Sequence, residues 1–325
     1  KLKGRIGIFL RGVVHLVQSD FRIMLYCLRK RVDIMMGTDV AIAHVGWLLR
    51  KVSLVFTDDD IHFIKPYCRL AFPFATSIVA PSTVWLGDWS TKKISYPGTQ
   101  KTAYIHPRVF NPNPNVLRKY NLHDTRFIIV RSVEFGALHD SIHGALSGIS
   151  DRVLDEIVAE LDYSHNIIIS YEGAVRQKYS KYCIKLNPSD MLDLMYYADL
   201  LIGDSQSMQV EAALLGTPSI RSNRWVTEGE KVSVIYDLEY KYNLCVGIPP
   251  HEEEAIISTA LRLSKPGVKD GWRKKTLKFF EENISLTDML VWLLEDFDVR
   301  SKEIANSKSV IDRFIYTQDY KEILG

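Results

Sequence analysis

The sequence has few cysteines and no long apolar run. The four cysteines among its 325 residues (Cys27, Cys68, Cys183 and Cys245) lie far apart and form no CxxC pair. This spacing argues against a disulfide framework or a zinc site, and it is typical of buried thiols in a reducing cytosol. No apolar stretch reaches the roughly 18 residues that are needed to span a bilayer. We therefore expect a cytoplasmic protein.

An excess of charge of one sign is also missing. The chain has 41 Lys and Arg residues against 39 Asp and Glu residues, so its net charge is only +2. A protein that binds nucleic acid by neutralising phosphates usually has a larger basic excess, so we expect no nucleic-acid partner. Hydrophobic residues make up 46% of the chain and charged residues 25%. These values are typical of a globular protein with a sizeable core, and at roughly 100–200 residues per domain the length predicts two domains.

The longest apolar stretch, residues 6–17, has basic residues within it and on both sides, namely Arg5, Arg11 and Arg22. One interpretation is an amphipathic helix that lies on anionic lipid, which would place the protein at the inner face of a membrane. The simpler interpretation, which we prefer, is a helix packed on a sheet. Only the first would add a peripheral membrane contact to the partners of the protein.

Strand-like and helix-like segments alternate along the chain. A continuous β-rich run at residues 52–56 and apolar runs at 127–130 and 200–202 are typical of strands buried in a parallel sheet. The alternation therefore predicts an α/β fold with two Rossmann-like domains that face a cleft.

Three prolines, Pro107, Pro112 and Pro114, interrupt this alternation, and we place the connection between the domains there. The expected organisation is an amino-terminal domain at residues 1–112, a carboxy-terminal domain at 113–300 and a loose tail at 301–325. The first domain opens on a helix and has few strands for this architecture. We expect its start to be incomplete in this chain.

The strongest local pattern spans residues 203–220, where a buried strand ends in a small polar turn and a helix begins at once. Free amide groups at a helix N-terminus suit a phosphate, and the hydroxyls of Ser205 and Ser207 could donate as well. Glu211, one to two turns into the helix, could accept hydrogen bonds from two ribose hydroxyls. The alternative is a helix whose amides are capped by Asp204 or Ser205. The residues alone leave both possibilities open.

The same run resembles the donor-nucleotide motif of non-hydrolysing UDP-N-acetylglucosamine 2-epimerases, which reads Thr-Asp-Ser-Gly-Gly-x-Gln-Glu-Glu-Ala and then Leu-Gly-x-Pro. The matching residues are Asp204, Ser205, Gln209, Glu211, Ala212, Leu215, Gly216 and Pro218. Gln206 and Ser207 replace the two glycines of the family. The resemblance implies that Ser205, with Gln206 and Ser207 beside it, contacts the diphosphate of UDP and that Glu211 holds its ribose.

The chain as a whole more closely resembles the family called domain of unknown function 354. The segments that carry this resemblance are residues 56–59, 103–107, 131–140 and 211–218, and it extends over about residues 30–295. The resemblance implies a place in the glycosyltransferase-B-like superfamily and does not fix a reaction.

Arg131 and Gly136 lie in a segment that resembles Arg-Arg-Glu-Asn-Phe-Gly of the same epimerases. A guanidinium at the end of a strand can form two parallel bonds to a pyrophosphate, and Gly136 would let the loop approach it. The alternative is an Arg131 that pairs with Glu134. Because Arg131 and a helix N-terminus can stabilise a diphosphate, we expect no cofactor and no metal.

Acidic residues that follow predicted strands are the candidates for chemistry. Asp58 and Asp59 could act as the base that deprotonates an acceptor hydroxyl, while the alternatives are a metal site that includes Asp60 or a helix cap. His139 is a candidate acid or base with a carboxylate next to it. Asp39 either faces the sugar or caps the helix that follows.

Together these features predict an enzyme that binds a UDP-sugar in its second domain and acts in the cleft. Glycosyl transfer to a glycan or a lipid-linked acceptor in surface-polysaccharide assembly is the preferred reaction. A UDP-N-acetylglucosamine 2-epimerase is the alternative, but the His-Val-Glu-Ala-Gly segment of those enzymes is replaced by residues 56–60. The alternative of another class is a non-catalytic protein that binds nucleotide-sugars.

Overall fold

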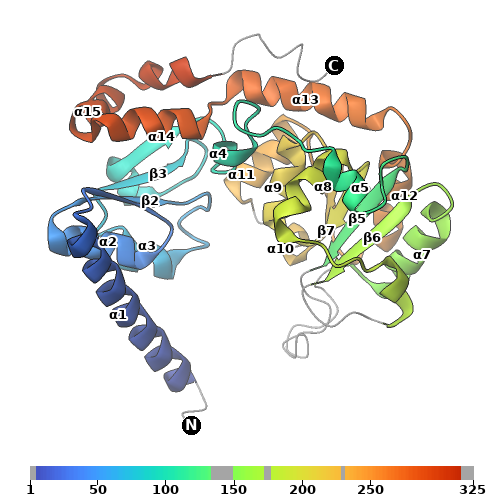
Figure 1. Cartoon of the computed structure of the whole chain (residues 1–325), viewed down its shortest axis with the longest axis horizontal. Helices are drawn as coiled ribbons and strands as arrows, with labels where there is room; N and C mark the ends of the chain where they lie inside the picture. Colours follow the sequence, from blue (N-terminus) through green and yellow to red (C-terminus); the bar gives the residue numbers. More distant parts are fainter. Residues whose placement is uncertain (1–4, 133–148, 172–176, 228–230, 316–325) are drawn as a thin grey trace. The chain divides into compact units, whose positions relative to one another are not determined.

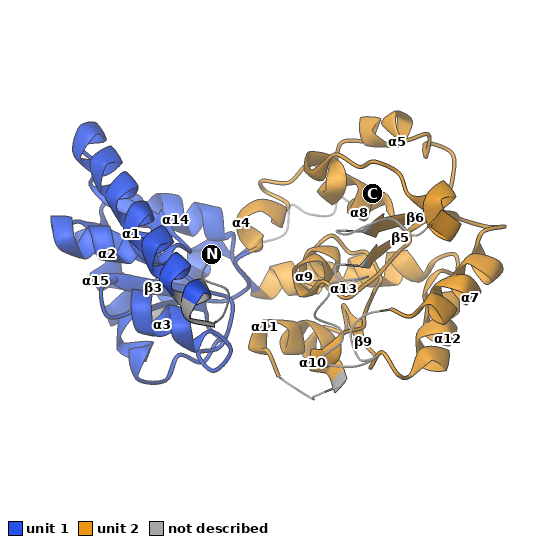
Figure 2. Ribbon diagram, turned by 90° about the horizontal axis from the view of Figure 1, so that it is seen from below, with its two compact units in different colours: residues 1–100, 283–316 blue, residues 101–282, 317–325 orange. Residues whose placement is uncertain are grey.

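The computed structural model describes residues 5–132, 149–171, 177–227 and 231–315. The chain divides into two compact units (Figure 2). Unit 1 comprises residues 1–100 and 283–316, and unit 2 comprises residues 101–282 and 317–325. Each unit is built on its own parallel sheet, which agrees with the expected α/β class (Figure 1).

The sheet of unit 1 has four strands in the order β1-β2-β3-β4, and every neighbouring pair is parallel. Its strands are β1 (Ile34–Gly37), β2 (Val52–Phe56), β3 (Ser77–Pro81) and β4 (Lys93–Tyr96). Its helices are α1 (Arg5–Lys30), α2 (Val40–Leu49), α3 (Lys65–Ala71), α14 (Leu286–Glu295) and α15 (Phe297–Asn306), with 3-10 turns at Gly87–Lys92 and Lys308–Phe314. Leu54 and Val55 of β2 are fully buried, as the continuous apolar run predicts.

The sheet of unit 2 has five parallel strands in the order β6-β5-β7-β8-β9. These are β5 (Phe127–Ser132), β6 (Asn166–Tyr171), β7 (Leu200–Gly203), β8 (Ser219–Arg221) and β9 (Val246–Gly247). The α-helices are α4 (Thr102–Ile105), α5 (Asn115–Lys119), α7 (Asp151–Leu161), α8 (Met191–Tyr197), α9 (Gln206–Leu214), α10 (Arg224–Thr227), α11 (Ser233–Tyr236), α12 (Glu253–Leu263) and α13 (Val268–Glu282). Further helical turns lie at Gln177–Tyr182, Pro188–Asp190 and Asp237–Lys241.

The boundary between the units differs from the predicted one at residue 112. The chain enters unit 2 at Lys101, and the proline-containing stretch is part of that unit. Ile105 and His106 are buried there, and the ring of His106 packs edge-on against Phe280 with 5.1 Å between the ring centroids. The structure has no helix or strand at residues 106–114, and the buried side chains of Ile105 and His106 hold the start of this stretch on unit 2.

The carboxy-terminal organisation also differs from the prediction. Residues 283–316 return to unit 1, where α14 and α15 lie beside each other (Figure 1). The expected loose tail contains the second part of α15, residues 301–306, and the 3-10 turn at Lys308–Phe314, and Ile304, Ile311 and Phe314 are buried. Widely spaced apolar residues in a polar sequence gave too weak a pattern for these elements to be recognised.

Candidate nucleotide site

The order of the strands in unit 2 reverses between β5 and β7. The chain passes from β5 to β6 on one side and then crosses to β7 on the other side of β5. In open α/β sheets a ligand binds at such a switch point, outside the carboxyl ends of the strands. Arg131 of β5 is in register with Ser170 of β6 and with Gly203 of β7, so these residues form one row at this edge.

Arg131 is half-buried in this row, and its Nη1 donates a hydrogen bond of 2.6 Å to Ser170 Oγ. Gly203 lies directly beside it. A Cβ on Gly203 would come within 2.6 Å of the backbone oxygen of Arg131, so this position requires glycine. The two strands therefore approach closely where the polar turn before α9 begins. Gly136, Glu134 and His139 lie outside the described residues, and the roles predicted for them stay predictions.

The N-terminus of α9 follows the switch point directly. Ser205 is its N-cap residue, and the side chain of Ser205 makes no capping hydrogen bond within the described part of the chain. Gln206 Oε1 is buried and has no hydrogen-bond partner among the described residues, whereas Ser207 is exposed. The amides of this helix start and the two serine hydroxyls are donors that could bind an anion, whereas Gln206 Oε1 can only accept a hydrogen bond.

A buried polar network supports the turn from the neighbouring strand. Asn223 Nδ2 donates to the backbone oxygen of Asp204 over 3.0 Å. Arg221 in turn donates to Asn223 Oδ1 and forms two bonds with Glu239, of 2.8 Å from Nε and 3.1 Å from Nη2. Sequence reasoning missed these residues, because a buried ion pair between β8 and the segment after α11 leaves no local pattern.

Glu211 lies one turn further along α9 and is half-buried. Its Oε1 accepts a hydrogen bond of 2.8 Å from the hydroxyl of Tyr104. Burial raises the pKa of Glu211, and the hydrogen bond from Tyr104 and the charge of Lys101 act against this increase. Tyr104 and Lys101 were not predicted as neighbours of Glu211. The only sequence signal for Tyr104 was the Ala103–Pro107 segment of the family resemblance, and Lys101 had none.

The acidic cluster of unit 1 is tied to backbone amides. Asp58 Oδ1 accepts a hydrogen bond of 2.8 Å from the amide of Gln100, and Asp60 Oδ1 accepts one of 2.6 Å from the amide of Trp85. Asp60 is buried, while Asp58 and Asp59 are half-buried. Asp60 thus has a structural role, and Asp58 and Asp59 remain the candidates for acid–base chemistry in this cluster.

Asp39 is the N-cap residue of α2, as one of its two predicted roles requires. Its Oδ1 accepts a hydrogen bond of 2.8 Å from the amide of Ala41. The side chain is exposed, and its role towards a sugar stays a prediction. Within the described residues, no group of three His, Cys, Asp or Glu side chains lies close enough together to hold a metal ion.

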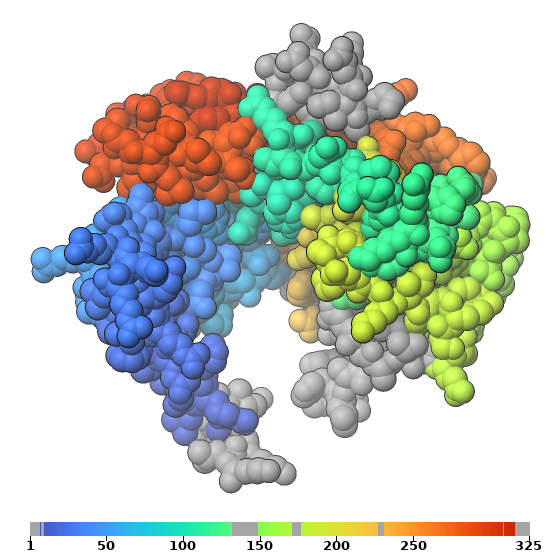
Figure 3. Space-filling model, in the orientation of Figure 1, coloured from blue at the N-terminus to red at the C-terminus, as the bar shows by residue number. Residues whose placement is uncertain are grey.

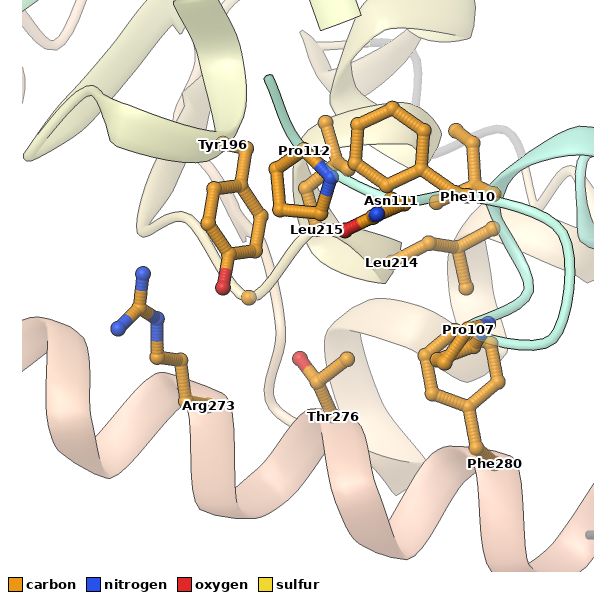
Figure 4. A pocket seen from close by; sticks show the side chains of 12 residues that line it. Pro107, Phe110, Asn111, Pro112, Tyr196, Leu214, Leu215, Arg273, Thr276 and Phe280 are labelled. Atoms are coloured by element: carbon orange, nitrogen blue, oxygen red, sulfur yellow. The ribbon is translucent and has the colours of Figure 1, made fainter. Parts of the chain in front are cut away.

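A small apolar cavity of about 90 Å³ lies at the opposite end of α9 (Figure 4). Its walls include Leu214, Phe110 and Phe280, with Arg273 and Tyr196 at one side. The nucleotide site proposed from the sequence lies at the first residues of α9, whereas this cavity lies at the last. We therefore treat the two as separate features.

Comparisons with known proteins place this geometry in context. A family model described as "Protein of unknown function (DUF354)" matches residues 28–287, well over half of the chain. The comparison with curated proteins finds no match.

Several solved structures share the fold. The UDP-GlcNAc 2-epimerase of Neisseria meningitidis bound to UDP-GlcNAc has a TM-score of 0.57 at 11% identity, covering 86% of this chain and 81% of that chain. The UDP-GlcNAc 2-epimerase of Methanocaldococcus jannaschii has a TM-score of 0.55 at 15% identity, covering 82% of each chain. The glycotransferase of kitacinnamycin has a TM-score of 0.51 at 9% identity, covering 91% of this chain and 84% of that chain. These likenesses confirm the expected class, an α/β fold with two Rossmann-like domains.

Proposed function

The chain belongs to the DUF354 family, and from this premise we propose that it is an enzyme that binds a UDP-sugar in unit 2 and transfers the sugar to an acceptor. The observation that carries the proposal is the switch point between β5 and β7, where Arg131 and the first residues of α9 lie together at one sheet edge. This is the position at which doubly wound sheets bind nucleotides.

The diphosphate is the part of the ligand that this edge suits best. The amides at the start of α9 carry the positive end of the helix dipole, and the guanidinium of Arg131 can form charge-assisted hydrogen bonds to phosphate oxygens. When a glycosyl bond breaks, negative charge develops on the departing diphosphate. Donors fixed in advance around that charge lower the barrier without needing to reorganise. In this proposal unit 2 stabilises the leaving group with its own residues.

Glu211 would hold the ribose. Oε1 of this carboxylate accepts a hydrogen bond from the hydroxyl of Tyr104. We therefore assign Oε2 to the hydrogen bonds from the ribose hydroxyls. Tyr104 then acts as a positioning residue, because its hydrogen bond fixes the orientation of the carboxylate. Asp58 or Asp59 of unit 1 would supply the base that activates the acceptor hydroxyl. The acceptor that we propose is a glycan or a lipid-linked molecule in surface-polysaccharide assembly.

Titration calorimetry with UDP tests the site. Arg131→Gln and Glu211→Gln should each weaken UDP binding by about 1.5–3 kcal/mol, which is the usual contribution of hydrogen bonds to charged groups. Arg118→Gln is the matched control, since Arg118 is an exposed arginine of α5 in the same unit. Unchanged affinity in Arg131→Gln with an intact fold would refute the site.

Epimerisation at C2 is the second candidate reaction, because two of the structures that share the fold are UDP-GlcNAc 2-epimerases. The two reactions leave different products. Release of UDP from a UDP-sugar with an acceptor present supports transfer, whereas deuterium from the solvent at C2 of the sugar supports epimerisation. Tight binding of UDP with neither reaction would support a non-catalytic nucleotide-sugar binding protein.

A further inference from the structure

The first helix of unit 1, α1, packs on the rest of its unit along one side only. Cys27 is buried against Met35 and Val45, and Ile23 and Met24 pack on the same cluster. These residues lie on the carboxy-terminal half of the helix. The amino-terminal half stands out from α2 and α3 (Figures 1 and 3).

An apolar face of α1 that adjoins and partly overlaps the packed one is exposed. The side chains on this side are between 42 and 60% exposed, and they are those of Leu10, Val13, Val14, Val17, Phe21 and Leu28. At about 100° per residue, all six fall within an arc of about 100°, and they extend over roughly 27 Å along the helix axis. We call these six residues the apolar stripe. A stripe of this width is typical of a helix face that is covered by another apolar surface.

A row of arginines follows one edge of the apolar stripe. Arg11, Arg22 and Arg29 lie within about 20° of one another around the helix, at about 110° from Leu10. All three are exposed. Arginine side chains at the edge of an apolar helix face can reach phosphate groups while their stems lie on the acyl boundary.

Negative charge on α1 is almost absent and is already paired. The only acidic residue of α1 is Asp20, and its Oδ2 lies 3.1 Å from His44 Nδ1 of α2. A second copy of this helix would therefore offer the arginine row no carboxylate. A surface of anionic headgroups offers both partners, phosphates for the arginines and acyl chains for the stripe.

We propose that α1 is a membrane-surface helix, whose apolar stripe inserts at the headgroup boundary of an anionic bilayer and whose arginine row binds the lipid phosphates. The helix would lie in the plane of the membrane. None of the helices within the described residues is long and apolar enough to cross it. This proposal is independent of the nucleotide site, because it rests on unit 1 alone.

Sedimentation of the whole protein with lipid vesicles tests the proposal. We expect binding to vesicles of phosphatidylcholine and phosphatidylglycerol, and much weaker binding to vesicles of phosphatidylcholine alone. Arg11→Gln with Arg22→Gln should weaken binding to the anionic vesicles at least tenfold, since each basic residue near such a surface contributes about fivefold. Val14→Asp with Val17→Asp should abolish binding, because two carboxylates would have to enter the apolar layer.

The matched control adds the same two carboxylates to the opposite side of the same helix, as Gly12→Asp with Ser19→Asp. No atom outside the helix lies within 4 Å of a Cβ at Gly12, so there is space for a side chain at this position. The control should keep most of the binding, and circular dichroism should show every variant folded.

Three results would overturn the proposal. The first is equal binding to both kinds of vesicle, and the second is equal loss in the control and in Val14→Asp with Val17→Asp. The third has two parts: the wild-type protein binds no vesicles, and analytical ultracentrifugation shows it as a dimer whereas Val14→Asp with Val17→Asp is a monomer. Titration of UDP in parallel separates this proposal from the nucleotide site, because stripe variants should leave UDP affinity unchanged.

Discussion

The ends of the strands in the two units use their polar residues differently. In unit 1, three aspartates each accept a hydrogen bond from a backbone amide. The amides bound by Asp58 and Asp60 lie in loops that follow other strands, and the amide bound by Asp39 lies at the start of a helix. In unit 2, the N-cap Ser205 makes no such bond within the described residues, and the polar network lies behind the turn. The same kind of sheet edge thus holds loops together in one unit and presents donors in the other.

Substitution of Asp58 and Asp59, the candidate bases of unit 1, gives the largest expected effect. Asp58→Asn with Asp59→Asn keeps an oxygen at position 58 that can still accept from Gln100, but it removes the base. Turnover, measured as UDP released from a UDP-sugar, should fall by about 10²–10⁴-fold, while UDP affinity stays the same. Near-native turnover would show that Asp58 and Asp59 are not the catalytic base. These carboxylates would then only hold loops in place, as Asp60 does.

The network behind the turn of unit 2 gives the next largest effect. Glu239→Ala would leave the guanidinium of Arg221 buried without its ion pair, and we expect a loss of about 3–5 kcal/mol in the free energy of unfolding. Urea denaturation measures this loss. The double variant Arg221→Met with Glu239→Leu is the control, because apolar groups of similar volume should recover most of the stability. A double variant as unstable as Glu239→Ala would contradict the explanation.

The smallest expected effect is a pH dependence of the free energy of unfolding, which arises from the buried amine of Lys269 in unit 2. Lys269 donates to the backbone oxygens of Tyr196 and Ala198, both over 2.7 Å. Burial, with the charge of Arg273 nearby, lowers the pKa of Lys269 to about 7 from its ordinary 10.5. Between these two pH values the unfolded chain holds a proton that the folded chain does not, so stability should increase as the pH rises.

Thermal unfolding at pH 7 and pH 9 measures this effect. The wild-type protein should gain roughly 1–3 kcal/mol relative to Lys269→Met over this interval, because the methionine variant has no amine to titrate. Parallel changes in both proteins would contradict the lowered pKa. A gain confined to the wild type would assign the pH dependence to Lys269, which belongs to α13 of unit 2.

The sequence allowed the sheets to be predicted because their strands are continuous apolar runs. Residues 127–130 and 200–202 are strands as expected, and Ile128 and Leu201 are fully buried. The start of α9 was recognised for a similar reason, because a buried strand, a polar turn and a helix form one short pattern.

The remaining features depend on contacts between distant residues. Tyr104 and Glu211 are 107 positions apart, and no pattern in either segment indicates the other. The return of residues 283–316 to unit 1 depends on apolar side chains such as Ile284 and Leu286, which fit any core equally well. Prolines indicated a break in regular structure, but they did not indicate on which side of the break the chain changes units.

The return of the chain to unit 1 has a consequence for the order of folding during synthesis. The amide of Ile284 donates to the backbone oxygen of Pro97, and Ile284, Leu286 and Met289 are fully buried in unit 1. Residues 101–282 form one uninterrupted stretch, so unit 2 has its whole sheet available before these residues leave the ribosome. Domains generally fold in the order in which they are translated. Here the core of the unit that is translated first is completed only after the whole sheet of the other unit, because about 180 residues separate its two segments.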